Sequence, residues 1–488
     1  MNAQQPHTHD ALVARLAATQ HDGRTANVRY RQDELQSLHS ALVESQRELQ
    51  AAMRQDSHFV DAEVDVEFAM GLDAVRHSYE TLDFDGSITE EYRIAKGKSN
   101  PDRHCAVGIV YINASVDFLF FSVIAPLAAA IAAGNVVMLE MRTGRGVLPP
   151  LLEKTLVQAL SSASFAVIHG SLDQALIQRL GVRCISLQPN NPSSSNKANR
   201  TVAIVDRTAD IAAAAASIVR ARFAFGGRSV YAPDFVLVNE FVKEKFLEAV
   251  VSEAIAYQGW PSPLSEEVNL RESFAKIATE NAASIVSMGP TSCVLDMTSR
   301  SAEILQSKVD RPVLVVLPCR SLEDAISFAN GSFASENPFP ETYLASYVFA
   351  TPKTAKYVSE SIHAAASFVN HLSVELLVGP AAPPTHPTCV RYRFQPRMFQ
   401  FPRPILNMPE KSQRLAEKAI TDIAARRTFL SQALRPLNPT GQPIRIAYIG
   451  FFEQGLLTSV AVALTPVAIG MGYAIYRATQ WAIGIVRT

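Results

Sequence analysis

The chain lacks an excess of charge of either sign. Its 488 residues include 45 lysines and arginines against 46 aspartates and glutamates, so the formal net charge is −1. A protein that binds nucleic acid needs surplus basic side chains to neutralise phosphates, and this balance argues against such a partner. The opening, MNAQQPHTHDALVARLAATQ, has no continuous apolar core, and we expect no secretory signal there.

Cysteine is scarce and scattered. The chain has no CxxC pair and no spacing typical of zinc ligands among its five cysteines, Cys105, Cys184, Cys293, Cys319 and Cys389. Isolated thiols of this kind are typical of buried residues in a reducing compartment. The sequence therefore predicts no disulfide and no metal site, and it places the body of the protein in the cytoplasm.

Charge is absent from one long interval near the C-terminus. No charged residue occurs between Glu453 and Arg477, where the sequence reads GLLTSVAVALTPVAIGMGYAIY. As a helix, this interval of about 23 residues would be roughly 34 Å long, enough to cross a hydrocarbon core of ~30 Å. Aromatic residues suited to a membrane interface lie near one edge, at Tyr473, Tyr476 and Trp481. We expect a membrane anchor; the alternative is a soluble helix that docks on the core and bends at Pro466.

The rest of the chain alternates between apolar strands and amphipathic helices. Between Asp33 and Asp56, apolar residues recur at steps of three and four, which predicts one amphipathic helix. The segments AVGIVYIN, VVMLE and FAVIH read as buried strands separated by helices, which implies a parallel sheet covered on both faces. A second α/β region follows a helix expected at 209–224 and continues to about residue 369.

Basic residues gather in the segment that precedes the apolar tail. A helix expected from about Pro409 to Leu434 carries Lys411, Arg414, Lys418, Arg426 and Arg427 beside an apolar stripe of Leu415, Ile420 and Ile423. A basic amphipathic helix just before an anchor suits a lipid surface. An ordinary solvated helix face would show the same pattern, so both interpretations stay open.

Several blocks resemble, in order, those of the aldehyde dehydrogenase superfamily, most closely its fatty-aldehyde (class 3) branch. They are RTANVRYRQDELQSLHSALVESQRELQAAMRQD, AVGIVYI, APLAAAIAAGNVVMLE, FAVIHGS, YAPDFVLVNE, RPVLVVLPCRSLEDAISFAN and ASYVFA, and together they span roughly residues 24–375. The resemblance implies an α/β fold with a Rossmann-like cofactor domain, an α/β catalytic domain and a small oligomerisation arm, in a homodimer.

This resemblance, together with the tail, predicts four parts of the chain. N-terminal helices and the Rossmann-like cofactor domain would occupy 1–208, and the catalytic-type α/β domain would occupy 209–375. An irregular segment with the basic amphipathic helix would follow at 376–440. The apolar tail at 441–488 would attach the protein to a membrane.

The residues that carry the family's chemistry are replaced. The family oxidises aldehydes with a cysteine thiolate, an asparagine that holds the oxyanion and a glutamate base. The resemblance places Ser229 at the nucleophile if a one-residue insertion is allowed, Asp117 at the oxyanion donor and Gln188 at the base. A hydroxyl is a weaker nucleophile than a thiol, a carboxylate repels an oxyanion, and glutamine cannot accept a proton.

The resemblance also assigns positions that would contact NAD. Glu140 stands where the family has a lysine on the adenosine ribose, and a carboxylate there can accept hydrogen bonds from ribose hydroxyls. The turn HGSLDQA keeps Gly170 and Ser171, whereas Lys308 replaces the glutamate that holds the nicotinamide ribose. NAD is therefore the expected cofactor, and a chain without any cofactor is the alternative.

Two hypotheses remain from the sequence. In the first, the protein is a membrane-attached oxidoreductase that converts an apolar aldehyde to a carboxylic acid with NAD(P). In the second, it is a catalytically silent homologue that serves as a scaffold or dimerisation partner. The sequence does not decide whether the chain is an enzyme.

The apolar tail leads to the first testable prediction. Deleting residues 453–488 removes the uncharged interval, so the shortened protein should move from the membrane fraction to the soluble fraction on ultracentrifugation. Full-length protein that is already soluble without detergent would contradict the anchor.

Overall fold

The computed structural model describes most of the chain, and its residues form two compact units, Met1–Ile405 and Leu406–Thr488. The described residues are 5–57, 59–98, 100, 102–141, 146–172, 175, 177–178, 182–186, 199–258, 270–331, 342–383, 389–403, 411–437 and 451–486. Gln188 lies outside them, so the position expected for the base is not described.

A four-stranded parallel sheet forms the centre of the first half of the chain, in the order β4-β3-β2-β5. Its strands are β2 (Ile109–Asn113), β3 (Val136–Glu140), β4 (Phe165–Ile168) and β5 (Arg183–Ser186). All five residues of β3 are buried, because both faces of the sheet are covered. Val137 packs with α6 (Leu119–Ala132), whereas Met138 belongs to the core beneath α1 (Gln5–Asp22).

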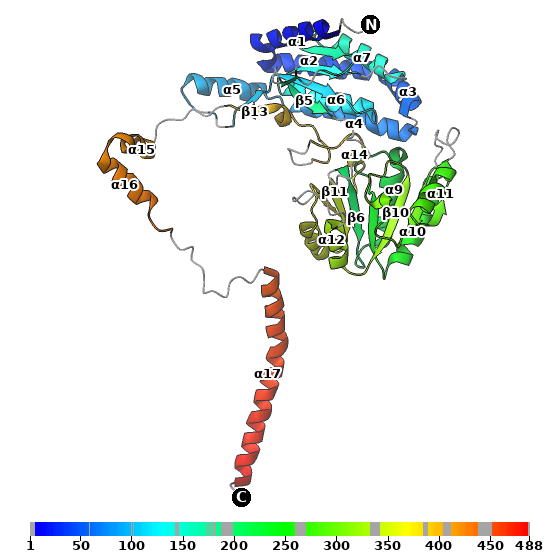
Figure 1. Cartoon of the computed structure of the whole chain (residues 1–488), viewed down its shortest axis with the longest axis vertical. Helices are drawn as coiled ribbons and strands as arrows, with labels where there is room; N and C mark the ends of the chain where they lie inside the picture. Colours follow the sequence, from blue (N-terminus) through cyan, green and yellow to red (C-terminus); the bar gives the residue numbers. More distant parts are fainter. Residues whose placement is uncertain are drawn as a thin grey trace. The chain divides into compact units, whose positions relative to one another are not determined.

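Further helices pack around this sheet and α6 (Figure 1). They are α2 (Val28–Glu44), α3 (Gln46–Ser57), α4 (Asp61–Glu80), α5 (Phe84–Ala95) and α7 (Leu148–Ala159). The single helix expected from Asp33 to Asp56 is wrong in one respect, because α2 ends at Glu44 and α3 starts after Ser45. Apolar periodicity continues across this break, which is why the pattern did not reveal it.

A seven-stranded sheet follows, in the order β12-β11-β6-β7-β10-β9-β8. Its strands are β6 (Thr201–Val205), β7 (Phe235–Asn239), β8 (Ser284–Met288), β9 (Cys293–Asp296), β10 (Val313–Cys319), β11 (Ala345–Phe349) and β12 (Ser367–Val369). All neighbours are parallel except β8 and β9. β6, inside the expected first domain at 1–208, pairs with β7 and β11 of this second sheet.

Helices flank the seven-stranded sheet (Figure 1). They are α9 (Ile211–Phe223), α10 (Lys243–Gln258), α11 (Leu270–Glu280), α12 (Leu322–Gly331) and α13 (Pro352–Ser361). Strands that alternate with helices and pair in parallel form doubly wound layers. The expected α/β architecture is confirmed.

A returning segment ties the end of the first unit back to its beginning. After α14 (Val374–Leu377), the chain reaches β13 (Gln400–Pro402), which pairs antiparallel with β1 (His104–Ala106). On the way, Arg391 donates to both carboxylate oxygens of Asp73 at 3.0 and 3.2 Å. These contacts join residues that are far apart in the sequence.

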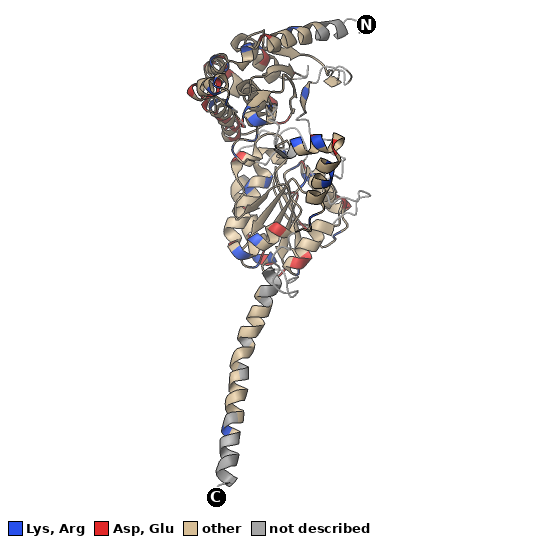
Figure 2. Ribbon diagram, turned by 90° about the vertical axis from the view of Figure 1, so that its left-hand side faces the viewer, with Lys and Arg blue, Asp and Glu red and all other residues tan. Residues whose placement is uncertain are grey.

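The described residues of the second unit, 411–437 and 451–486, include the helices α15 (Lys411–Thr421), α16 (Ile423–Ala433) and α17 (Phe451–Val486). The single basic helix expected from Pro409 to Leu434 is therefore two helices, because the Asp422 side chain accepts from the Ala424 amide at 2.9 Å and starts a new one. Helix α17 is long and apolar enough to cross a membrane at Leu457–Ile475, with a mean hydropathy of 1.6. Figure 2 shows the scarcity of charge along it.

Two glycines with positive φ give a prediction about packing. Gly379 (φ +83°) faces the Phe121 ring so closely that a Cβ would overlap it, whereas Gly97 (φ +70°) has no atom within 4 Å of that position. Both Gly→Ala changes should cost about 1–2 kcal/mol of backbone strain. Gly379→Ala should cost about 1–3 kcal/mol more through overpacking, seen as a lower unfolding temperature. Equal effects of the two substitutions would contradict this account.

Candidate functional site

The loops that carry Asp117 and Ser229 meet through two phenylalanines in left-handed conformations. Phe118 has φ 55° and ψ 45°, and Phe225 has φ 54° and ψ 34°. Such conformations cost of order 1–3 kcal/mol each and persist only where the surroundings enforce them. The two rings contact each other edge to face at 5.1 Å, and Phe59 packs on them at 5.3 and 5.4 Å. This aromatic cluster, Phe59, Phe118 and Phe225, fixes the relative position of the two loops.

Two glutamates one turn apart on α4 hold the same loops. Glu63 Oε1 accepts from the Phe225 amide at 2.7 Å, and Glu67 Oε1 accepts from the Phe121 amide at 3.2 Å. Glu67 serves as the N-terminal cap of α6, whose own N-cap residue, Phe118, makes no side-chain cap. Burial raises the pKa of Glu67 to about 7. The two carboxylates stabilise the backbone on either side of the aromatic cluster.

Asp117 and Arg228 form an ion pair across the junction of the loops. Arg228 Nη1 lies 3.7 Å from Asp117 Oδ1, with both side chains partly exposed. Burial raises the pKa of Asp117, and Arg228 opposes that effect. The structure thus brings the expected oxyanion position next to the turn that ends in Ser229. A carboxylate paired with arginine cannot donate a hydrogen bond to an oxyanion.

Ser229 points into the protein. Its side chain is 0% exposed, and its Oγ accepts from the Tyr231 amide at 3.3 Å. Within the described ranges, no side-chain base forms a hydrogen bond with this hydroxyl. The next residue, Val230, is only half-buried. A buried hydroxyl without a base is poorly arranged for nucleophilic attack.

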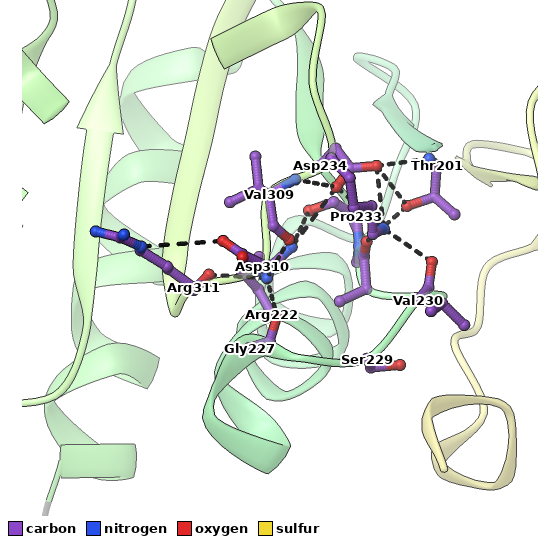
Figure 3. Close-up of polar contacts among 12 residues, drawn as sticks. Thr201, Arg222, Gly227, Ser229, Val230, Pro233, Asp234, Val309, Asp310 and Arg311 are labelled. Atoms are coloured by element: carbon purple, nitrogen blue, oxygen red, sulfur yellow. Dashed lines mark hydrogen bonds and ion pairs between the residues drawn. The ribbon is translucent and has the colours of Figure 1, made fainter. Parts of the chain in front are cut away.

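A buried arginine holds the turn that precedes Ser229 (Figure 3). Arg222 lies beneath the turn and is completely buried. Its guanidinium donates to four backbone carbonyls, those of Gly227, Val309, Arg311 and Pro233. Asp234 lies 3.9 Å away, and burial lowers the pKa of Arg222 to about 10. Arg222 therefore fixes the backbone path of the turn.

Lys308 belongs to this buried network through Asp234. Its Nζ donates to the carbonyls of Val230 and Ala232 at 2.8 and 3.2 Å and to Asp234 at 3.1 Å. Burial lowers the pKa of Lys308 to about 8. An ammonium has three donors, and these contacts use all of them. The expected contact between Lys308 and a nicotinamide ribose therefore gains no support from the geometry.

A second buried arginine fills the space behind the turn. Arg393 is 1% exposed and donates to the carbonyls of Pro380 and Glu375 at 2.6 and 3.0 Å. Its guanidinium lies 5.2 Å from the ring centroid of Phe121 and 5.4 Å from that of Tyr231. In the part of the chain that is described, no carboxylate lies within 4 Å of it. Cation–π contacts and carbonyls stabilise the charge in place of a counter-ion.

Sequence reasoning missed Glu63, Glu67 and Arg393. Glu67 was detectable in principle, because it lies on the same face of α4 as the buried residues Val64, Phe68 and Val75. A glutamate on an apolar helix face predicts a buried carboxylate with hydrogen-bond donors nearby. Arg393 gave no such signal, since the run RYR stands in a segment without periodicity.

The carboxyl ends of β3 and β4 bring Glu140, Gly170 and Ser171 to one edge of the four-stranded sheet. Gly170 (φ +94°) has no atom within 4 Å of where a Cβ would lie, and Ser171 is exposed. Glu140 is only 5% exposed and accepts a hydrogen bond from Tyr111. Ligands of doubly wound sheets bind at this edge. The turn is open at Gly170, whereas Lys308, at the expected nicotinamide-ribose position, is held by contacts within the protein.

The thiols of Cys184, Cys293 and Cys319 are poor nucleophiles. Burial raises the pKa of Cys293 to about 11 and that of Cys319 to about 12. Cys184 is exposed on β5, and its pKa is also raised, first by partial burial and then by Glu140. Among the described residues, no group of three metal-ligating side chains is present.

Comparison with known proteins supports the architecture. Residues 192–380 match the model of the aldehyde dehydrogenase family. The chain is 26% identical over 280 residues to 4,4'-diaponeurosporen-aldehyde dehydrogenase of Staphylococcus aureus, covering 51% of this chain but only 59% of that one. It is 24% identical over 352 residues to human aldehyde dehydrogenase family 3 member B1, covering 65% and 75% of the two chains. Part of this chain thus matches the aldehyde dehydrogenase family, and the chain is similar to members of that superfamily.

A further relative and a solved structure show which branch and which fold the chain resembles. The dimeric NADP-preferring aldehyde dehydrogenase of the dog is 22% identical over 378 residues, covering 70% of this chain and 80% of that one. Substrate-bound Staphylococcus aureus AldH superposes with a TM-score of 0.63 at 18% identity, covering 85% of this chain and 99% of that one. The family 3 relatives confirm the resemblance to the class 3 branch, and the solved structures confirm the aldehyde dehydrogenase-like fold.

The pKa of Glu67 gives a prediction for this dehydrogenase homologue. Because its folded pKa is about 7 instead of the usual 4.5, the native state binds more protons than the unfolded state between these values. Stability should fall as the pH rises through this window. Glu67→Gln keeps an acceptor for the Phe121 amide without the charge. Its free energy of unfolding should therefore exceed that of the parent by an amount that grows from pH 5 to pH 8, up to about 3 kcal/mol.

Chemical denaturation at a series of pH values measures this difference. Glu80→Gln, on the exposed side of the same helix, provides the control and should follow the parent profile. Parallel profiles for Glu67→Gln and the parent would show that the buried carboxylate does not titrate in this range.

Proposed function

We propose that this chain keeps the aldehyde dehydrogenase fold without the family's thiol-dependent oxidation, and that it acts as a membrane-attached scaffold or dimerisation partner. The observation that carries this proposal is the ion pair of Arg228 and Asp117, at 3.7 Å, across the two loops that would form the reactive centre. This ion pair lies where the two loops meet, and its two charges neutralise each other.

The remaining contacts at the centre support the same conclusion. Thiol-dependent oxidation needs a nucleophile that can reach the carbonyl, and the Ser229 hydroxyl is buried and bound to a backbone amide. It also needs a donor for the oxyanion, and loss of one such donor costs about 3–4 kcal/mol in the transition state. Behind the turn, Arg393 and the rings of Phe121 and Tyr231 fill the interior.

A second candidate function is oxidation of an apolar aldehyde with NAD(P). It is favoured by the names of the relatives and by the open turn at Gly170 and Ser171. Bound NAD(P) would supply the acceptor for a hydride, and Glu140, Gly170, Ser171 and Lys308 remain the proposed cofactor positions. Ser229, Asp117 and Gln188 remain the proposed catalytic positions. The apolar tail would bring such a centre to substrates dissolved in lipid.

The assembly and its location belong to the same proposal. A dimer is supported by the name of the dimeric NADP-preferring relative, and a homodimer is the assembly that we propose here. The tail at 441–488 would anchor a body made of a cofactor-type domain at 1–208 and a catalytic-type domain at 209–375. The segment at 376–440 would link body and anchor on the cytoplasmic side.

A paired binding and turnover measurement tests the two functions. Full-length protein in detergent is titrated with NAD and with NADP while its unfolding temperature is recorded, and NAD(P)H absorbance is followed with octanal and longer apolar aldehydes. A ligand present at 100 times its Kd stabilises the fold by about 2.7 kcal/mol, so binding is easily seen. We expect no NAD(P)H production, whether or not the cofactor binds.

Ser229→Ala provides the matched variant. If the parent produces NAD(P)H and Ser229→Ala does not, the hydroxyl takes part in the chemistry and the silent scaffold is wrong. An active aldehyde dehydrogenase of the family, measured in the same detergent, excludes a failure of the assay.

A further inference from the structure

Helices α15 and α16 form a hairpin that is held together by small residues and end caps. Among the described side chains of α15 and α16, those of Ala419 and Ala425 are buried, and the two helices contact each other. The Arg426 Nε donates to the Ala419 carbonyl at 3.2 Å and so caps the end of α15. The hairpin therefore uses its small side chains for internal packing and leaves its large apolar ones for other contacts.

The side of α16 opposite Ala425 carries a stripe of large apolar residues. Ile423, Leu430 and Leu434 follow one another at steps of seven and four, which places them on one face of a helix. They are 66%, 49% and 78% exposed, and Leu437 just beyond them is 94% exposed. Clustered apolar side chains of this size mark a contact surface when they are exposed.

The same hairpin concentrates positive charge. Residues 411–437 contain six basic side chains and two acidic ones, whereas the whole chain has a net charge of −1. Arg427 falls on the apolar stripe between Ile423 and Leu430, and Arg435 follows Leu434 directly. Basic and apolar side chains are therefore mixed on one surface, instead of lying on opposite faces. Such a mixture matches a lipid interface with anionic headgroups more closely than it matches an apolar protein groove.

We propose that the α15–α16 hairpin docks on the anionic phospholipid headgroups of the leaflet that α17 enters. This inference rests on the membrane attachment proposed above. The apolar span begins at Leu457, a short distance along the chain from Leu437, so the hairpin reaches the same surface. Anionic lipids are concentrated in the cytoplasmic leaflet, which assigns the body of the protein to the cytoplasmic side.

Hydrogen exchange of the full-length chain in nanodiscs tests this docking. The protein is incorporated into discs of phosphatidylcholine alone and into discs that also contain phosphatidylserine. In the anionic discs, the amides of α16 should exchange at least about ten-fold more slowly, because each basic side chain near an anionic surface raises binding about five-fold. The double variant Arg427→Glu, Arg435→Glu should lose this protection.

A matched control reverses two charges on the body. The double variant Lys353→Glu, Lys356→Glu alters exposed residues of α13 and should keep the protection of α16. Equal exchange of α16 in the two kinds of disc, whether fast or slow, would overturn the docking, since a solvated hairpin or one packed on protein does not respond to lipid charge. Protein that enters neither kind of disc would instead contradict the membrane attachment itself, and this inference with it.

Discussion

The contact between the two strained loops is the constraint on which the centre of this molecule depends. Phe118 and Phe225 adopt a backbone conformation that is unfavourable for any residue with a side chain, and their rings, with Phe59, enforce it by packing against one another. The carboxylates of Glu63 and Glu67 satisfy the amides of these loops from α4. This arrangement positions Asp117, Arg228 and Ser229.

Much of the fold could be predicted from the sequence, because parallel strands that are buried on both faces have continuous apolar sequences. The segments expected as strands at VVMLE and FAVIH are found as β3 and β4. Helix ends were harder to place. Apolar periodicity continues across Ser45 and Asp422, although each residue separates two helices, since local caps end a helix without interrupting the pattern on its buried face.

The candidate site was predictable only in part. A comparison of residue types with those of the family located Asp117 and Ser229, and the structure places the loops that carry them side by side. It could not reveal that Arg228 pairs with Asp117, or that Lys308 turns inward to Asp234. Contacts of this kind depend on where long side chains point after the helices and sheets have packed together. Propensity and spacing carry no information about that direction.

The contacts of Arg222 show how the backbone of the turn before Ser229 is held. This guanidinium donates to main-chain oxygens in and around the turn, those of Gly227, Pro233, Val309 and Arg311, and lies 3.9 Å from the Asp234 carboxylate. Main-chain oxygens are present whatever residue stands at a position. Substitutions at 228, 229 and 230 therefore keep the main-chain oxygens that Arg222 binds, even where they change the side chains of the turn.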